Sequence, residues 1–495
     1  MHLADLLHPL AIPLPPLLAG LASRLFPGAP ARLAPTAAAA AFGMALLLAL
    51  LPDHADTRLA RLDVLASTMA LLVAFLGTVV LRFAARYLEG DPTRPRFLSW
   101  MSLTLAAVLT LVVSNHLMLL AGAWLATSLC LHRLLLHHPD RPGAVFAARK
   151  KFVYSRSAEV LLLAAILMLH QGHGTWQIDA LTASVAAGNT AGLPVAAALL
   201  ALCAMLKSAQ FPFHSWLPDT MDTPTPVSAF MHAGIINGGG FLVLRLAPVF
   251  TAAPLSMHLL AITGALTAAF GAIVMLTQPG VKRALAFSTI AQMGFMMLQC
   301  GLGAWGLALL HLVAHSLYKA HAFLHAGSTI GTTPRAAVPL STPALALGIM
   351  TACSLVAGLA TSMHTLIPSA THVPRIFLLI LALALAYGIA RAASGHRQSL
   401  ARALAAAAAI ASTALSLPLA AGHLLPSPAS HLPPAWLTAV VASIFLLLFL
   451  FQSLLWRASA HPVGRSLYIH ALNGFYISTL ANRLLGRLWP SRMLS

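Results

Sequence analysis

The sequence predicts an all-α polytopic membrane protein, because it is strongly apolar, sparsely charged and built of recurrent long apolar runs. The chain has 495 residues, of which 59% are hydrophobic and 8% charged, and its mean hydropathy is +0.85. A soluble domain carries roughly 25% charged residues. Runs of about 20 apolar residues, the length that crosses a bilayer, recur along nearly the whole chain.

Helices, not barrel strands, are expected to cross the membrane. Within lipid a segment has to satisfy its own backbone hydrogen bonds, which only helices and closed barrels achieve. The alternation of apolar and polar residues that marks barrel strands is absent. We expect about 13 to 15 transmembrane helices in one domain over residues 1–460, followed by an amphipathic, interfacial segment over residues 461–495. That segment mixes Arg with Tyr, Phe and Trp, which suits an interfacial helix or a partner contact, and the alternative is an ordinary surface helix end.

Charge, cysteine content and the amino terminus exclude other classes. The net charge of +18 is typical of basic cytoplasmic loops, and no soluble patch of basic and aromatic residues indicates nucleic-acid binding. The four cysteines lie in separate apolar segments without CxxC spacing, which argues against disulfides and metal ligation. The first 26 residues lack a basic start and contain interrupting prolines, so we expect a weak first membrane segment and no signal peptide.

A lysine ends one of the apolar runs. Lys207 follows about 14 apolar residues, so its amine lies inside the bundle if the helix continues to Gln210. A buried lysine can take up and release a proton near neutral pH. The alternative is a lysine near a helix end whose ammonium reaches the membrane surface. The residue type alone leaves both interpretations open.

A glutamate opens the apolar run over residues 158–170. Glu159 follows Arg156 by three residues, a spacing that puts both side chains on one helix face where they can pair. An acid at this place is either functional or an ordinary acid in the first turn of a helix. The long apolar run that follows at once favours the functional interpretation.

Five protonatable groups lie in "HLVAHSLYKAHAFLHAG". At about 100° per residue they occupy about 160° of a helix surface and extend over about 21 Å. Such a stripe is what a proton relay needs, whereas the alternative is a set of hydrogen-bonded core histidines. We expect the relay. The five groups are His311, His315, Lys319, His321 and His325.

A proline-rich stretch, "HSWLPDTMDTPTPVS", follows Lys207. Its prolines prevent a regular helix, and a loop at membrane depth is allowed only where it is buried in protein or lines a wet cavity. Pro226 can start the next helix, which the glycines at 238–240 weaken about three turns later. The residues expected to shape the loop are Pro212, Pro218, Asp219, Asp222, Pro224 and Pro226.

The stretch "KSAQFPFHSWLPDTMDTPTPVSAFMHAG" resembles the signature of the proton-translocating antiporter-like family. That family includes the L, M and N membrane subunits of NADH-quinone oxidoreductase and the large subunits of multi-subunit cation/proton antiporters. The stretches "KKFVYSRSAEV", "TQPGVKRALAFSTIAQMGFM" and "HLVAHSLYKAHAFLHAGS" also match in spacing and residue type. The resemblance implies an antiporter-like bundle with broken helices. In it Lys207 is the central buried lysine, His232 sits in the broken helix, and His311, His315 and Lys319 belong to the proton path.

The chain departs from the family pattern in two places. Family members that pump carry a glutamate directly after the tryptophan of a "GWE" motif, whereas "GAWLATS" puts Leu125 at that position. The family's later membrane lysine has no clear counterpart. Because an unpaired buried charge is costly, Lys207 needs another partner, for which Glu159 is the candidate.

Within the family, "MDTPTPVSAFMHAGIINGGGFL" and "LYIHALNGFY" resemble the branch of DAB-type inorganic carbon transporter subunits. The resemblance implies a heteromeric complex in the bacterial inner membrane, in which a large zinc-binding partner similar to β-carbonic anhydrases hydrates CO2 to bicarbonate. Flow of protons or another cation through this multi-pass subunit would make hydration one-way. This chain has no catalytic or metal-ligating constellation, so the chemistry and the zinc are expected in the partner.

Two other functions stay open on the sequence. The first is a proton-translocating subunit of an NADH-quinone oxidoreductase or of a multi-subunit cation/proton antiporter. The missing glutamate and the missing later lysine argue against it. The second is a passive membrane anchor that recruits a soluble enzyme, and the density of protonatable groups on one helix argues against that function.

Overall fold

The chain is a bundle of helices. All named elements in the described part of the chain are helical. Eleven helical segments there are long and apolar enough to cross a membrane, and three shorter apolar helices accompany them. The predicted all-α polytopic class is therefore confirmed. The residues that the computed structural model describes are 8–26, 31–51, 57–329, 341–366, 375–394, 397–424, 433–457 and 462–488.

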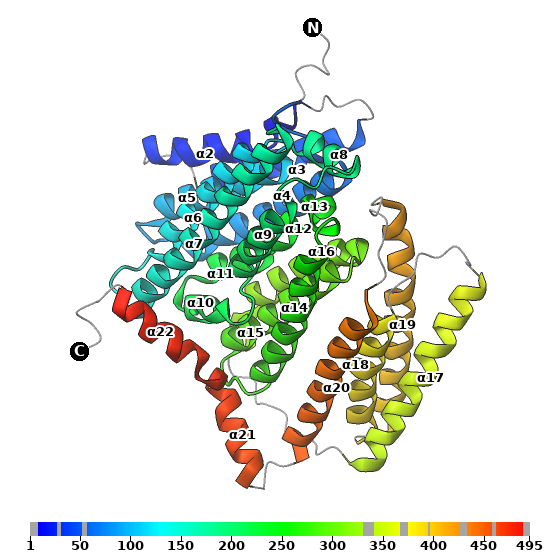
Figure 1. Cartoon of the computed structure of the whole chain (residues 1–495). Helices are drawn as coiled ribbons and strands as arrows, with labels where there is room; N and C mark the ends of the chain where they lie inside the picture. Colours follow the sequence, from blue (N-terminus) through cyan, green and yellow to red (C-terminus); the bar gives the residue numbers. More distant parts are fainter. Residues whose placement is uncertain are drawn as a thin grey trace.

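The amino-terminal helices pack side by side and are drawn in blue, cyan and blue-green (Figure 1). The weak first segment is a helix of 12 residues that starts directly after Pro13. Its next two prolines, Pro15 and Pro16, lie in the first helical turn, where proline is tolerated. Residues 1–7 of that predicted segment lie outside the described part. The helices are α2 (Leu14–Leu25), α3 (Leu33–Leu50), α4 (Val64–Tyr87), α5 (Arg94–Val113), α6 (Leu117–Leu135), α7 (Pro142–His173) and α8 (Ile178–Ala186).

Two interrupted helices follow. The helix α9 (Leu193–Lys207) ends at the lysine, and the proline-rich loop after it folds as short helical turns, including α10 (Trp216–Asp219). The next helix is broken into α11 (Thr225–Ala233) and α12 (Gly238–Arg245), and α13 (Ala247–Thr251) follows. The break lies at Gly234, one turn before the predicted glycines. Those glycines lie within α12 and let it pack closely on α9, since a Cβ on Gly239 would overlap the backbone of α9.

Three long helices complete the core of the molecule: α14 (Pro254–Met275), α15 (Val281–Gly301) and α16 (Trp305–Leu324). The first two pack backbone against backbone, since a Cβ on Gly264 or Gly294 would lie about 2.5 Å from main-chain atoms of the facing helix. Small residues at such contacts are the usual way for membrane helices to associate, because lipid supplies no hydrophobic force between them.

Four further helices form a separate group beside this core, drawn in yellow and orange (Figure 1). Apolar side chains join the two groups: Leu437, Val441 and Phe445 of the last helix cluster with Ala261 and Ala265 of α14. The four helices are α17 (Thr342–Leu366), α18 (Arg375–Ala393), α19 (Arg397–Leu424) and α20 (Ala435–Arg457).

The carboxy-terminal segment returns to the core. From the end of α20 the helices α21 (Pro462–Leu472) and α22 (Ile477–Leu488) run past α14 and α15 towards α7 and α10 (Figure 1). Leu485 of α22 is buried, whereas Leu480 and Leu484 are exposed. Residues 489–495 of the predicted amphipathic segment lie outside the described part.

Candidate proton path

Lys207 lies inside the bundle. Its side chain is the last of α9 and is only 9% exposed. The Nζ atom is 4.6 Å from the ring centroid of Trp124 on α6, a distance at which an ammonium is attracted to the ring face. The position at which the family carries a glutamate points elsewhere, because Leu125 is 38% exposed. Trp124 is therefore the α6 side chain that faces the lysine.

Glu159 is held by its own helix. Its Oε1 accepts a hydrogen bond from Arg156 Nη2 at 2.8 Å, which is the pair that the spacing predicted. It is also the acid whose charge acts on Lys207, although the two do not form an ion pair within 4 Å. The arrangement is a buried lysine with a nearby carboxylate that is already shared with an arginine.

A second buried lysine, which the sequence pattern did not single out, lies near this pair. Lys151 Nζ donates to Ser128 O at 2.8 Å and to Ser128 Oγ at 3.0 Å, and Arg156 Nη2 donates to the same hydroxyl at 3.0 Å. The apolar run predicted a span beginning at 158, but α7 begins at Pro142 and has 32 residues. The sequence signal that could have indicated this lysine is the doublet "KK" shortly before the apolar run, provided that the helix is extended back to include it.

A second group of polar side chains surrounds Lys319 on α16. Lys319 Nζ is fully buried and donates to Leu285 O at 3.1 Å. The hydroxyl of Thr289 donates to the same carbonyl at 3.0 Å and is hydrogen-bonded to His232 Nδ1, also at 3.0 Å. Thr289 therefore ties the His232 ring to the carbonyl that accepts from Lys319. The Nε2 atom of His232 is buried and has no hydrogen-bond partner among the described residues.

The stripe on α16 divides into two parts. His311 and His315 follow each other with ring centroids 6.0 Å apart, and His315 is buried beside Lys319. His321 and His325 are exposed and stack on each other at 5.5 Å. The expectation that all five share one inward face is therefore wrong. The buried face of α16 is centred near Leu312, so His321 lies about 180° away.

The broken helix connects the two lysine groups. Asn237 Nδ2 donates to Ser316 Oγ on α16 at 2.7 Å and to Ala233 O at 2.9 Å. The next residue, Gly238, lies against Lys207, since a Cβ there would be 3.3 Å from the lysine Cε. Two successive residues thus contact α16 on one side and Lys207 on the other, which places the break of the helix between the protonatable groups.

The proline-rich loop is packed against the end of α9. Trp216 Nε1 donates to Leu206 O at 3.2 Å, and Ser208, directly after α9, donates through Oγ to Ile236 O in the break between α11 and α12 at 2.7 Å. Asp219 Oδ2 accepts from Lys150 Nζ at 2.8 Å. Pro218, Pro224 and Pro226 are buried, Asp219 is half-buried, and Pro212 and Asp222 are exposed.

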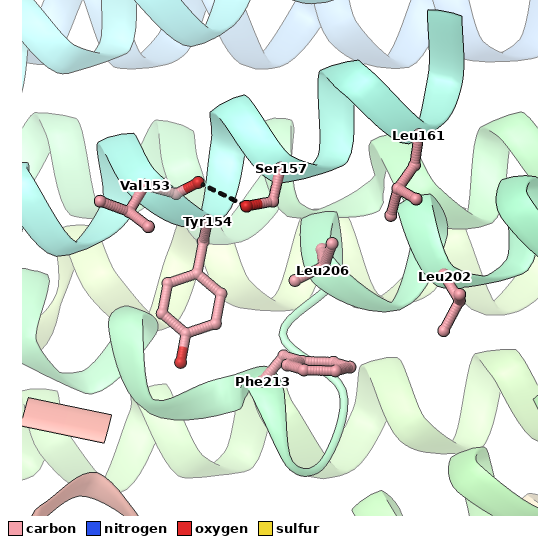
Figure 2. A pocket seen from close by; sticks show the side chains of 7 residues that line it. All are labelled: Val153, Tyr154, Ser157, Leu161, Leu202, Leu206 and Phe213. Carbon is pink, nitrogen blue, oxygen red and sulfur yellow. Dashed lines mark hydrogen bonds between the residues drawn. The ribbon is translucent and has the colours of Figure 1, made fainter. Parts of the chain in front are cut away.

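A pocket of about 320 Å³ lies between α7, α9 and the loop (Figure 2). Its lining carries two hydroxyl groups, those of Tyr154 and Ser157, and no charged side chain. The pocket therefore offers the path hydroxyl groups but no charged side chain. Its other lining residues are Val153, Leu161, Leu202, Leu206 and Phe213.

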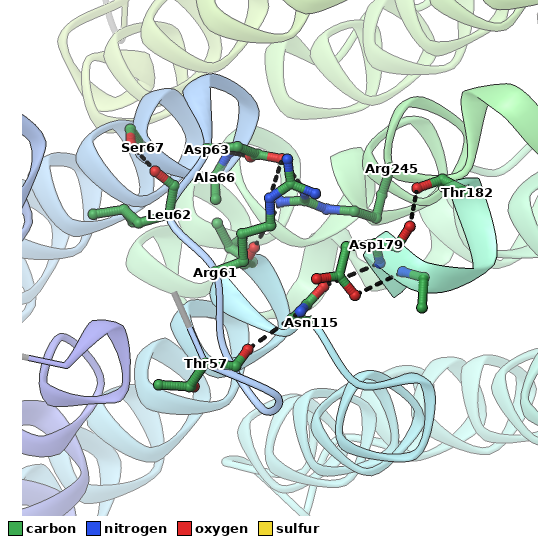
Figure 3. A network of polar contacts seen from close by, with 12 residues as sticks. Thr57, Arg61, Leu62, Asp63, Ala66, Ser67, Asn115, Asp179, Thr182 and Arg245 are labelled. Carbon is green, nitrogen blue, oxygen red and sulfur yellow. Dashed lines mark hydrogen bonds and ion pairs between the residues drawn. The ribbon is translucent and has the colours of Figure 1, made fainter. Parts of the chain in front are cut away.

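A further polar network ties the broken helix to the start of α4 (Figure 3). Arg245, the last residue of α12, donates to Asp63 Oδ2 at 2.6 Å, and Asp63 also caps α4 by accepting from the amide of Ala66 at 2.9 Å. Burial raises the pKa of Asp63, but the Arg245 charge and these hydrogen bonds more than offset it, so the pKa is lowered. The network fixes α12 at the end away from Lys207.

Two family models match the sequence. Residues 114–395, more than half of the chain, match the model described as "NADH:quinone oxidoreductase/Mrp antiporter, TM". Residues 59–98 match the model described as "NADH-Ubiquinone oxidoreductase (complex I), chain 5 N-terminus". The first range contains all the candidate path residues, from Glu159 to His325.

Several curated proteins are similar over large parts of the chain. One is a "probable inorganic carbon transporter subunit DabB2" of Halothiobacillus neapolitanus, 38% identical over 450 residues, which cover 87% of this chain and 80% of that protein. A DabB of Hydrogenovibrio crunogenus is 45% identical over 58% of this chain and 57% of its own length. The chloroplastic NAD(P)H-quinone oxidoreductase subunit 5 of Zygnema circumcarinatum is 39% identical over 54% of this chain and 39% of its own length.

Solved structures share the fold. A chain of the Mrp complex from Dietzia sp. matches with a TM-score of 0.60 at 24% identity, over 97% of this chain and 57% of the other. A chain of an archaeal membrane-bound sulfane sulfur reductase matches with a TM-score of 0.58 at 17% identity, over 98% and 100%. The resemblance inferred from the motifs is confirmed by the family model and the curated relatives, and this chain belongs to the NADH:quinone oxidoreductase/Mrp antiporter family.

Proposed function

We propose that this chain is the ion-conducting membrane subunit of an energy-coupled inorganic carbon accumulation complex. The observation that carries the proposal is the pair of buried lysine groups joined by the broken helix at Asn237 and Gly238. Ionisable groups are expensive in a membrane interior, and their placement there is the mark of an ion path. The relatives named as inorganic carbon transporter subunits supply the substrate class.

In this proposal the two lysines take up and release protons in turn. Lys207 exchanges a proton near Glu159, whose charge offsets that of the ammonium. The broken helix links the two sides: Asn237 bonds to Ser316 on α16, the helix of His315 and Lys319, and the next residue, Gly238, lies against Lys207. His232 contributes an Nε2 atom without a hydrogen-bond partner among the described residues, as does His315. These nitrogens can accept protons between the lysines; His311 extends the path on α16, whereas the exposed His321 and His325 would act only at its mouth.

The carbon chemistry is assigned to a partner subunit. We propose a heteromeric complex in the bacterial inner membrane with a large DabA-type subunit, similar to carbonic anhydrases and carrying the zinc. Hydration of CO2 would occur there, and ion flow through this chain, of protons or of another cation, would make it one-way. The membrane lipid is the other expected contact, and nucleic acid is not expected.

The first experiment is to isolate the protein from its native membrane in mild detergent and identify what accompanies it. A single large zinc protein is expected. Flavin, iron–sulfur or quinone-reducing subunits would contradict the proposal and favour the redox-driven pump, which the relatives named as NAD(P)H-quinone oxidoreductase subunits make the second candidate.

Inorganic carbon uptake is then measured in cells with and without an uncoupler that dissipates the proton gradient. Loss of uptake is expected if protons are the coupling ion, and loss only with a sodium ionophore would identify sodium. Uptake that survives both treatments would mean that the chain is a passive anchor.

A further inference from the structure

One fully buried lysine is shared by two segments that are far apart in the sequence. Lys150 Nζ donates to Asp219 Oδ2 of the proline-rich loop at 2.8 Å and to Asn482 Oδ1 of α22 at 2.6 Å. Its side chain has no exposed surface, whereas that of Asp219 is 25% exposed. The carboxy-terminal helix therefore closes over an ion pair between α7 and the loop.

The amide oxygen of Asn482 matters because a buried ammonium is costly. An ion removed from water needs an opposite charge and hydrogen-bond partners for its remaining donors, and a lysine has three donors. With Asn482 in place two of them are used, by a carboxylate and an amide oxygen. An ion pair open to water would contribute little to holding the loop. Covered by α22, the same pair holds the loop more firmly.

The path of the carboxy-terminal segment towards this lysine is fixed by other contacts. Gln278 Nε2 at the end of α14 donates to Leu472 O at 3.1 Å, and the ring of Phe475 lies 6.1 Å from that of Phe270. The bend between α21 and α22 contains three successive residues with positive φ: Gly474, Phe475 and Tyr476. Non-glycine residues adopt that conformation only where the surroundings stabilise it.

The loop in turn contacts the end of the helix that carries the central lysine. Trp216 donates to the carbonyl of Leu206, the residue directly before Lys207. Asp219 and Trp216 are the last and first residues of the short helix α10, so one helical turn carries both the carboxylate and the indole. The contacts therefore run from Asn482 through Lys150, Asp219 and Trp216 to the backbone beside Lys207.

We infer that α22 is a strap that holds the proline-rich loop over residues 208–224, and that Lys150 and Asn482 are positioning residues for Lys207. This inference rests on the proposed function only for its effect on ion conduction. The effect on the loop itself is a property of the fold and is measured separately.

The test compares variants at position 482 in the full complex in detergent or lipid nanodiscs. Asn482→Leu removes the oxygen and keeps the branched shape of the side chain, Asn482→Ala removes it without bulk, and Asn482→Asp keeps an oxygen for Lys150. The matched control is Asn473→Leu, because Asn473, directly after α21, is exposed and its side-chain hydrogen bond among the described residues is local, to Ile469 O at 2.8 Å. Amide hydrogen exchange of the loop and inorganic carbon uptake are both measured.

We expect loop exchange to rise about tenfold in Asn482→Leu and Asn482→Ala, corresponding to one lost charge-assisted hydrogen bond, while uptake falls. Asn482→Asp is expected to retain slow exchange and uptake, and Asn473→Leu to behave as the unaltered protein. Unchanged loop exchange in both oxygen-deleted variants would overturn the strap. Faster exchange with normal uptake would overturn the positioning role. Faster exchange in a complex that transports no inorganic carbon in any form would leave the strap and contradict the proposed function instead.

Discussion

The core and the helix group α17–α20 differ in what they bury. In the described part of the chain, the buried lysines and arginine all belong to the core, whereas the buried polar residue of the second group is Ser453. In the broken helix over Thr225–Arg245, 89% of the most apolar 18-residue stretch is buried inside the molecule. In the helix that starts at Thr342, 22% of the corresponding stretch is buried. The list of the core's buried cations is Lys150, Lys151, Lys207, Arg245 and Lys319.

The difference shows where charges are tolerated in such a molecule. A cation in lipid is costly, so it is found where neighbouring helices supply oxygens, aromatic faces or opposite charges. The core supplies these through broken helices and the loop. The second group exposes apolar side chains such as Met350 and Leu447, which suits contact with lipid or with another apolar surface. Substitutions of similar chemistry should therefore have unequal effects in the two regions.

The largest effect is expected at the central lysine. Lys207→Ala removes the protonatable group that faces Trp124, and we expect inorganic carbon uptake to fall about tenfold or more while the complex still assembles. The control in the second group is Arg402→Ala, since Arg402 is exposed on α19. Uptake by membrane vesicles and recovery of the assembled complex are measured together. Normal uptake in Lys207→Ala would remove this lysine from the path.

A smaller effect is expected from a single hydroxyl. Thr289→Val deletes the group that links His232 to the carbonyl shared with Lys319, at nearly constant volume. Leaving one buried ring nitrogen unpaired should lower uptake about fivefold. Thr351→Val on α17 is the matched control, because Thr351 also bonds back to its own helix, to Leu347 O at 2.7 Å. Equal uptake by the two variants would contradict the expectation that the same substitution has a larger effect in the core than in α17–α20.

The smallest effect concerns pH and stability. His214 of the proline-rich loop is buried between Phe211 and Phe270, and burial, with the Lys150 charge, lowers its pKa to about 3. The unfolded chain takes up this proton below pH 6.5 and the folded one does not. The contribution of His214 to the free energy of unfolding is therefore fully present above that pH. It decreases as the pH falls, by up to about 2 kcal/mol at pH 5.

We expect His214→Phe, which suits the aromatic surroundings, to flatten the decline of the melting temperature between pH 7 and pH 5 by about 2–4 °C. His470→Phe serves as the control because His470 is exposed on α21. Thermal melts of the purified protein at both pH values give the comparison. A decline as steep in His214→Phe as in the unaltered protein would show that another group titrates.

The sequence by itself determined the helical class, the apolar helix that carries Lys207 (though it ends there and does not continue to Gln210), the irregular proline loop and the pairing of Arg156 with Glu159. Each follows from local physics: the length of apolar runs, the effect of proline and a three-residue spacing on a helix. The motifs also determined the family, because the signature residues are contiguous in the chain.

Only the tertiary structure decided which face of α16 turns inward, and so separated His321 and His325 from Lys319. It also placed Lys150 and Lys151 in the interior, joined Asp63 to Arg245, and brought Asn482 to a lysine 332 residues away. Helical periodicity gives the relative directions of side chains on one helix but not the direction of its neighbours. Contacts between distant segments depend on how all the helices pack, which no local pattern specifies.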